Sequence, residues 1–261
     1  MNFKSPHFTF DGRSSKEFQL RICRVGNNND TGIFGLDRSI EEESMTGSIP
    51  QFKSLKYNNI TMSITLIKTD GFDALPFTEE DKFEIVKWLF QDEYKAFTSE
   101  DKPDLTYYVI FTKGSNYENA LKQGYITLTM RLNAPYGYSN IISNPVKVCG
   151  SDIVELYNKS NVGTYAYPDL EFQVMEGATS VKIENLSTGD VMTFEDLPVG
   201  SHVYCYNEDL KQFVMLNNED YNVRPHYKGN WLRLAYGKNT IRITSDNCHL
   251  KIMGQAKVAL T

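Results

Sequence analysis

The sequence predicts a protein built mostly of β-strands with one short helix, a β+α fold class. Three observations lead to this prediction. Two segments of the first half alternate apolar and polar residues, the pattern of strands with one buried face. One segment repeats apolar residues every three or four positions, as a helix with one buried face does. The second half holds short strand-like segments between regularly spaced turn signals, which is typical of a β-sandwich.

The first half is expected to be a β-rich domain, residues 1–140. Apolar residues 18, 20 and 22 predict a strand after an Asp-Gly turn signal. Alternation predicts strands over 60–66 and 126–132, and a denser apolar run predicts a third over 105–111. Two polar stretches, 26–35 and about 41–56, are interpreted as exposed loops. Such loops often contact partner proteins.

The helix is expected between two of these strands. Thr78 is placed to cap its start, and Asp81 three residues later completes a variant of the capping box. Two glutamates in the first turn suit the positive end of the helix dipole. The apolar face is expected to pack on the sheet, with Trp88 on its flank, and to consist of Phe83, Val86, Leu89 and Phe90.

The second domain, residues 141–261, is expected to be a β-sandwich. Proline, glycine and asparagine cluster over 135–145, which indicates a boundary there. Whether the final strand, 249–261, completes the first domain is left open. Turns are expected at 185–190, 197–200 and 237–239, and strands at 181–184, 191–194, 203–206, 231–236 and 240–244.

Composition excludes several functions. The net charge is −6, whereas a free-standing nucleic-acid binder is normally basic. No apolar run approaches the roughly 20 residues of a membrane span, and the first residues lack the basic-then-apolar pattern of a secretion signal. Folding in a cytoplasm is therefore expected, with free thiols at the four widely spaced cysteines, Cys23, Cys149, Cys205 and Cys248.

No catalytic residue, metal site or cofactor is predicted. Two His-Cys pairs have the residue types of zinc ligands, namely His202 with Cys205 and Cys248 with His249. Within a strand these spacings point the two side chains of a pair to opposite faces of the sheet. Runs of acidic residues single out no pair that would flank a cleft. The sequence also lacks the serine-nucleophile and phosphate-binding glycine motifs.

Aromatic residues are dense in the second half, and sugars stack on such rings in β-sandwich modules. The candidates for a sugar platform are Tyr165, Tyr167 and Trp231. Packing within the domain is the favoured interpretation of these rings, and glycan binding is kept as the alternative.

Several motifs follow one another in an order that resembles a known family. The chain opens with FTFDGRSSKEF over 8–18. Further matching segments are 38–43, 47–52, 86–89, 124–126 and 134–138. Together they resemble the distal tail proteins of long-tailed bacteriophages and prophages. In the second half, 161–168, 177–189 and 231–241 resemble the opening and closing strands of that family's sandwich.

The resemblance implies a structural virion protein of the phage tail, assembled in the bacterial cytoplasm, and no enzyme. It implies an N-terminal ring-forming domain and a C-terminal sandwich similar to galectins and carbohydrate-binding modules. A homohexameric ring would join the tail tube protein to the tail-tip or tail-associated protein. DNA would pass through without specific binding, the outer domains would dock adsorption or receptor-binding proteins, and no part would insert into a membrane.

Three glutamates are the expected channel or ring contact. Glu41, Glu42 and Glu43 are predicted on a mobile loop near the channel, where their charge would repel DNA phosphates. Two other functions stay open. One is a glycan-binding sandwich for host cell-wall recognition; the other is a wall-degrading tail enzyme, which no constellation of residues favours.

Overall fold

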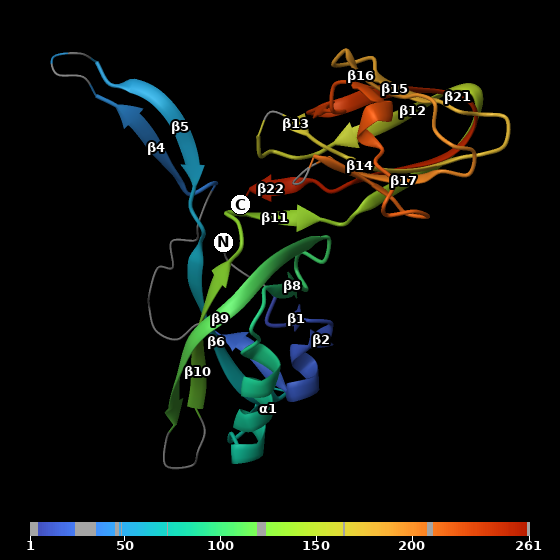
Figure 1. Cartoon of the computed structure of the whole chain (residues 1–261). Coiled ribbons are helices and arrows are strands. Elements are labelled where there is room, and N and C mark those ends of the chain that lie inside the picture. The colour runs from blue at the N-terminus through green and yellow to red at the C-terminus, as the bar shows by residue number, and fades with distance from the viewer. Residues whose placement is uncertain are drawn as a thin grey trace. The chain divides into compact units, whose positions relative to one another are not determined.

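The computed structural model describes residues 5–23, 35–44, 47, 49–71, 73–118, 124–163, 165–207 and 211–259. Strands make up most of these residues, and α1 (Glu79–Leu89) is the one α-helix among them, which confirms the predicted fold class. The chain forms two compact units, Met1–Ser139 with Ala259–Thr261, and Asn140–Val258 (Figure 1). The expected loop at 26–35 lies outside the described residues except for its last position, and no described helix is long and apolar enough to cross a membrane.

The first unit is built on a 10-stranded antiparallel sheet in the order β2-β1-β8-β9-β10-β6-β3. β11 pairs with β9 and with β22, and β7 pairs with β6. The strands are β1 (Phe8–Phe10), β2 (Arg13–Ser14), β3 (Leu20–Cys23), β6 (Thr61–Asp70), β7 (Asp73–Ala74), β8 (Lys95–Ser99), β9 (Leu105–Glu118), β10 (Gly124–Leu132), β11 (Tyr136–Ser139) and β22 (Lys257–Ala259).

The start of the chain forms a tight hairpin. Asp11 and Gly12 have φ values of 49° and 78°, the left-handed backbone that a two-residue turn between strands requires. β1 and β2 pair on either side of this turn. The predicted strand through residue 18 begins later, because Ser15–Phe18 form a 3₁₀-helix, η1, that Ser14 and Glu17 close with a capping box.

The two alternating segments form strands, as predicted, and the structure shows that these strands are neighbours. β6 and β10 pair directly, and their apolar residues point into the core, where Ile64, Leu66, Leu128 and Met130 are all buried. The opposite face carries hydroxyls, and the Thr65 and Thr127 side-chain oxygens lie 3.1 Å apart in a hydrogen bond. The period of two therefore identified both the strands and their buried side.

The predicted cap of α1 is confirmed, but its predicted apolar face is right only in part. The Asp81 backbone N–H donates to the Thr78 hydroxyl over 3.1 Å, and the Thr78 N–H donates to the Asp81 carboxylate over 2.8 Å. Phe83 and Val86 are 66% and 54% exposed. Leu89 is buried and Phe90 packs against the core, as predicted, and Ile85 and Trp88 complete the buried side.

Trp88 explains this rotation of the helix. Its ring stacks on Phe18 at a centroid distance of 4.3 Å and on Phe8 at 5.7 Å. Its indole N–H donates to the Phe10 carbonyl over 3.0 Å, so burial leaves no polar atom of the side chain without a partner. The residues through Phe83 and those through Ile85 both have the spacing of a helix face. The face that carries Trp88 is buried, because its large ring packs in the core and its N–H has a hydrogen-bond partner there.

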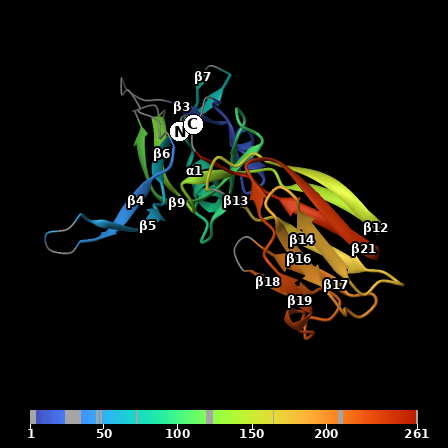
Figure 2. The same cartoon turned by 90° about the horizontal axis from the view of Figure 1, so that it is seen from above.

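The second unit is an eight-stranded sheet that curls around its own core (Figure 2). The order is β18-β17-β14-β21-β15-β16-β19, and β12 pairs along the other edge of β21. The sheet's strands are β12 (Ile142–Asn158), β14 (Asp169–Val174), β15 (Val181–Asn185), β16 (Asp190–Phe194), β17 (His202–Tyr206), β18 (Gln212–Met215), β19 (Tyr227–Gly229) and β21 (Gly237–Gly254). A separate pair consists of β13 (Tyr165–Ala166) and β20 (Leu234–Ala235), and Arg224–His226 form a 3₁₀-helix, η2.

The 18-residue strand β21 organises this unit. One half of its edge pairs with β15 and the other half with β14. The two groups of strands face each other across the core, where the rings of Phe172 and Phe194 lie 4.9 Å apart. This two-layered arrangement is the predicted β-sandwich, formed by one curled sheet.

Some predicted elements of the second unit differ from the structure. The segment 231–236 forms only the two-residue strand β20, and the expected turn at 237–239 is the beginning of β21. The reason is Asn239, whose side chain folds back to accept from the Ala235 N–H over 2.9 Å and to donate to its carbonyl over 2.7 Å. The bend therefore comes before Gly237 and depends on a side chain, and glycine-asparagine composition alone does not locate it.

Candidate functional site

A two-stranded hairpin, which we call the arm, projects from the sheet of the first unit (Figure 1). It consists of β4 (Arg38–Glu43) and β5 (Gln51–Tyr57), which pair with each other and with no other strand in the described part of the chain. Figure 2 shows the same projection from a second direction. A lone two-stranded hairpin is marginally stable in water, so the arm is suited to being stabilised by a partner.

The arm corrects the interpretation of 41–56 as a loop. Glu41, Glu42 and Glu43 lie in β4, opposite β5. The base of the arm is closed at Asp37 and Asn58, where the Asn58 N–H donates to the Asp37 carbonyl over 3.0 Å and its amide donates to the Asp37 carboxylate over 3.1 Å. A bulge between Glu41 and Glu42 interrupts the alternation of β5, which is why the sequence pattern did not reveal the strand.

One face of the arm is apolar and exposed. Ile40 lies opposite Leu55, Arg38 opposite Tyr57, and Glu42 opposite Phe52, and residues directly opposite each other share a face. The exposed fractions are 61% for Ile40, 63% for Phe52, 43% for Leu55 and 41% for Tyr57. Fully burying one such side chain contributes roughly 1.5–3 kcal/mol. A partner that covers this face would therefore form a considerably more stable complex with the arm.

The other face of the arm is polar. It carries Glu41 and Glu43 with Ser54, and the Ser54 hydroxyl donates to the Glu41 carboxylate over 2.6 Å. The three predicted glutamates are therefore divided, since Glu42 shares the apolar face. Their placement at a channel stays a prediction.

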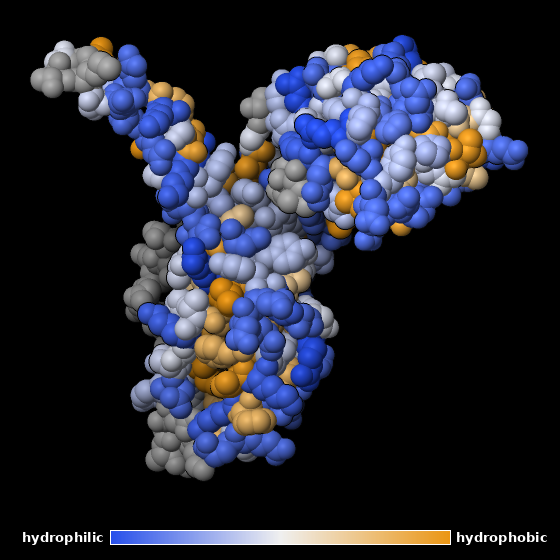
Figure 3. Space-filling view, viewed as in Figure 1, coloured by the Kyte–Doolittle hydropathy of each residue, from blue (hydrophilic) through white to orange (hydrophobic). Residues whose placement is uncertain are grey.

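A second exposed apolar surface lies on α1, and we call it the helix stripe. It consists of Phe83 and Val86, both more than half exposed. Figure 3 shows apolar residues at the surface both along the arm and in the region of α1. A soluble monomer shows single exposed apolar residues as a rule, but a row of them marks an interaction site.

The rings predicted as a sugar platform are engaged in packing within the second unit. The Arg233 guanidinium lies 4.6 Å from the centre of the Tyr165 ring, and the Lys211 ammonium lies 3.3 Å from that of Tyr167. Trp231 stacks on the rings of Phe213 at 4.8 Å and Tyr227 at 5.4 Å. The structure thus places the two tyrosines at cations and the tryptophan in an aromatic cluster; sugar binding stays a prediction.

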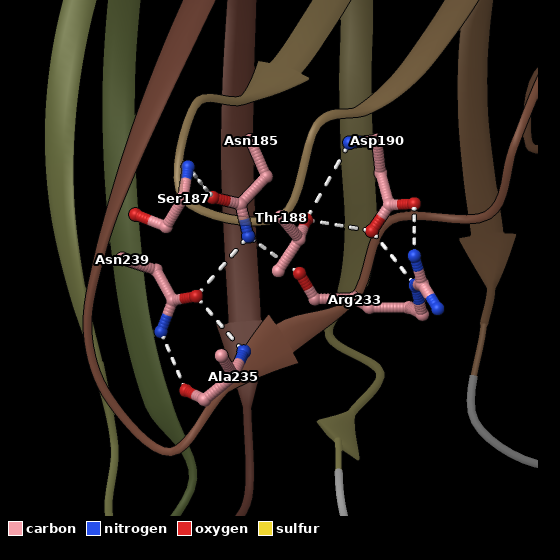
Figure 4. A network of polar contacts seen from close by, with 7 residues as sticks. All are labelled: Asn185, Ser187, Thr188, Asp190, Arg233, Ala235 and Asn239. Atoms are coloured by element: carbon pink, nitrogen blue, oxygen red, sulfur yellow. Dashed lines mark hydrogen bonds and ion pairs between the residues drawn. The ribbon is translucent and has the colours of Figure 1, made fainter.

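A network of buried polar side chains lies within the second unit (Figure 4). The amide group of Asn185 donates to the Arg233 carbonyl and, over 3.1 Å, to the side chain of Asn239, and its oxygen accepts from the Ser187 N–H over 2.9 Å. Both asparagines are fully buried. These bonds join the β15–β16 turn, the segment before β20 and the start of β21.

An ion pair completes the network. The Arg233 guanidinium binds the Asp190 carboxylate through two hydrogen bonds of 2.9 and 2.8 Å, and the Asp190 side chain is only 2% exposed. Burial works to raise the pKa of this carboxyl, but the hydrogen bonds from Arg233 and Thr188 outweigh it and hold the pKa below its usual value. No sequence pattern indicates this network, because its residues are far apart in the chain and of ordinary types.

The histidines and cysteines considered for zinc have other environments. Cys205 and Cys248 are buried free thiols, and burial raises the pKa of both. His202 lies 2.9 Å from the Glu171 carboxylate. Within the described ranges no cluster of three or more potential ligands is present.

Comparisons with known proteins identify the family. A family model described as the phage tail protein N-terminal domain matches residues 3–134, and one described as the phage tail C-terminal domain matches residues 136–253. A search of curated proteins finds no match.

Two solved structures are similar over nearly the whole chain. The crystal structure of the phage SPP1 Dit protein, described as a paradigm of the hub adsorption apparatus in phages infecting Gram-positive bacteria, has a TM-score of 0.64 at 14% identity and covers 95% of this chain and 98% of that one. The activated baseplate of phage P2 gives a TM-score of 0.48 at 10% identity, with coverage of 98% and 99%. The first likeness shows a shared fold. Because the N-terminal family model alone matches half of the 261 residues, the chain belongs to this family of phage tail proteins and is a structural component of the virion.

Proposed function

We propose that this protein forms a hexameric ring at the distal end of the tail tube. The ring joins the tail tube protein to the tail-tip or tail-associated protein and surrounds the path of the DNA. The second units dock adsorption or receptor-binding proteins. The role is structural, with no chemical step.

The arm is the observation that carries this proposal. Its apolar face is exposed in a chain that belongs to a phage tail family, and an exposed apolar face of this length favours a permanent neighbour. A closed ring needs two different faces on each subunit. The first unit offers two, the arm and the helix stripe. The likeness of fold to a hub protein supports a place at the tail tip.

The proposal predicts a defined mass. The purified protein, alone or mixed with its tube and tip proteins, is expected to form closed hexamers. Light scattering gives the mass, and negative-stain images show whether the particles are rings with a central opening. A protein that stays monomeric at every concentration, even with both neighbours present, contradicts the proposal.

Glu41 and Glu43 lie on one face of the arm and Glu42 on the other, which allows a test of where the DNA passes. If the polar face of the arm borders the channel, replacing Glu41 and Glu43 by lysine is expected to leave the fold intact, since exposed charges contribute little to stability. The rings should then bind duplex DNA in a salt-dependent way, measured by a shift assay at 50 and 200 mM salt.

The double change of Glu219 and Asp220 to lysine is the matched control, since it makes the same change of charge at two exposed residues of the second unit. It is expected to leave DNA binding unchanged. Two results together would show that the polar face does not border the DNA path. The Glu41→Lys, Glu43→Lys variant would form normal rings that do not bind DNA at low salt, and particles that carry these rings would eject DNA at the normal rate.

A further inference from the structure

We propose that the unpaired edge of β12 binds an extended strand of the protein that docks on the second unit, so that the partner adds a strand to the sheet. This inference rests on the docking role in the proposed function and names its contact. The segment concerned is 151–158 of β12, which we call the open edge.

β12 is a long strand with one unpaired side. It has 17 residues and pairs with β21, and with no other strand in the described part of the chain. Figure 2 shows it beside β21. An edge strand presents a row of unpaired N–H and C=O groups. The group that complements such a row is another extended strand.

The two halves of β12 differ in how they are protected against pairing. In the first half, Pro145 has no N–H, Lys147 is exposed, and a bulge between Val148 and Gly150 interrupts the register. Proline, lysine and bulges are the features that keep edge strands from pairing with other chains. The open edge, with the sequence SDIVELYN, contains no proline, lysine or bulge.

One hydrogen bond shows which backbone groups point away from the sheet. The Ile153 N–H donates to the Asp152 carboxylate over 2.8 Å, so it does not point at β21. The backbone groups of successive residues in a strand alternate in direction. The N–H and C=O groups of Ile153, Glu155 and Tyr157 therefore line the open edge.

The side chains of the same residues describe the partner strand. Ile153 and Tyr157 are 55% and 56% exposed, on either side of Glu155. The Glu155 carboxylate lies 2.6 Å from the Lys238 ammonium, and Asp152 adds a further exposed carboxylate. A strand with apolar residues opposite Ile153 and Tyr157 and a basic residue between them matches this edge in both shape and charge.

The occupant of the open edge is a different protein. Two copies of β12 would pair in antiparallel fashion across a two-fold axis, whereas neighbours in a ring are related by rotation about the ring axis and meet through different surfaces. The open edge therefore stays unpaired between copies within the ring, on the unit whose proposed role is to dock another protein.

Hydrogen exchange in assembled tails tests this contact. In the purified protein, the amides of residues 153, 155 and 157 are expected to exchange fast, and those of 154 and 156 slowly, because only the latter point at β21. In purified tails that carry the docked protein, the fast amides should slow by roughly 100-fold, as amides in stable strands do.

Two results overturn the inference. One is exchange of residues 153, 155 and 157 that stays fast in the tails. The other is slow exchange of these amides in rings of the purified protein alone, which would show that a second copy covers the edge.

Two changes at one position separate the backbone from the side chain. Glu155→Pro removes an outward N–H at an edge position, where proline is tolerated, and Glu155→Ala keeps it. Retention of the docked protein is expected to weaken roughly tenfold or more for proline, because a carbonyl of the partner strand loses its donor, and to weaken less for alanine. Mass spectrometry of purified tails measures the retention, and circular dichroism excludes unfolding. Equal effects of the two changes overturn the backbone contact.

The results also separate this contact from the proposed ring. Slow exchange of the open edge in the tails, with a purified protein that forms no hexamer, would leave the contact standing and reject the ring. Hexameric rings at the end of the tube whose open edge exchanges fast would leave the ring standing and reject the contact.

Discussion

Replacing Trp88 by alanine is expected to destabilise the first unit by about 3–5 kcal/mol, the range for a large buried ring. The side chain is only 4% exposed. It holds three parts of the unit together, since it stacks on Phe18 and Phe8 and donates a hydrogen bond to the Phe10 carbonyl. Alanine leaves a cavity and removes one hydrogen bond to the Phe10 carbonyl. Urea unfolding followed by circular dichroism measures the loss.

Two further variants separate the causes. Trp88→Phe keeps a ring but loses the indole N–H, so the expected cost is smaller, about 1 kcal/mol for one lost hydrogen bond. Val86→Asp, which the sequence analysis would expect to prevent folding, should change stability little, about 0.5 kcal/mol, because the side chain is exposed. Wild-type stability of Trp88→Ala, or unfolding of Val86→Asp at concentrations that keep the chain monomeric, would contradict the observed face of α1.

Replacing Asn185 by alanine is expected to destabilise the second unit by roughly 2–6 kcal/mol. The change removes three hydrogen bonds and orphans the Ser187 N–H and the Arg233 carbonyl, at roughly 1–3 kcal/mol for each group left unpaired. The effect should extend to the neighbouring turn and to the start of β21, because the side chain joins them. Thermal unfolding measures the shift.

An exposed asparagine provides the matched control. The side chain of Asn217 also bridges two backbone segments, accepting from the His202 N–H over 3.1 Å and donating to the Gly200 carbonyl over 2.9 Å. Water replaces these partners when the amide is removed, so Asn217→Ala is expected to cost about 1 kcal/mol or less. Equal losses for both variants would show that burial of Asn185 does not matter.

The sequence predicted those parts of the fold that depend on local patterns. Alternation located β6 and β10 with their buried faces, and the capping box located the start of α1. The sequence did not predict the buried face of α1 correctly, because two sets of residues have the spacing of a helix face. The stripes through Phe83 and through Ile85 both have helical spacing, and only the tertiary contacts of Trp88 decide between them.

The candidate site was predicted only in part. The segment of Glu41, Glu42 and Glu43 is the arm, but the bulge hid its strands, and the pairing that separates Glu42 from its neighbours is not a local property. The network around Asn185 could not be predicted, because its members come together only when β15, β20 and β21 do.

The course of the chain around the second unit bears on how tails diversify. The unit is entered through β12 and left through β21, and the first residue of β12 lies opposite the last of β21, about 5 Å away. The strands just outside, β11 and β22, also pair. The segment from β12 to β21 is therefore an insertion between two adjacent strands. Recombination could exchange it for an unrelated module, or remove it, while the first sheet keeps every strand, so one part of the protein can change without altering the other.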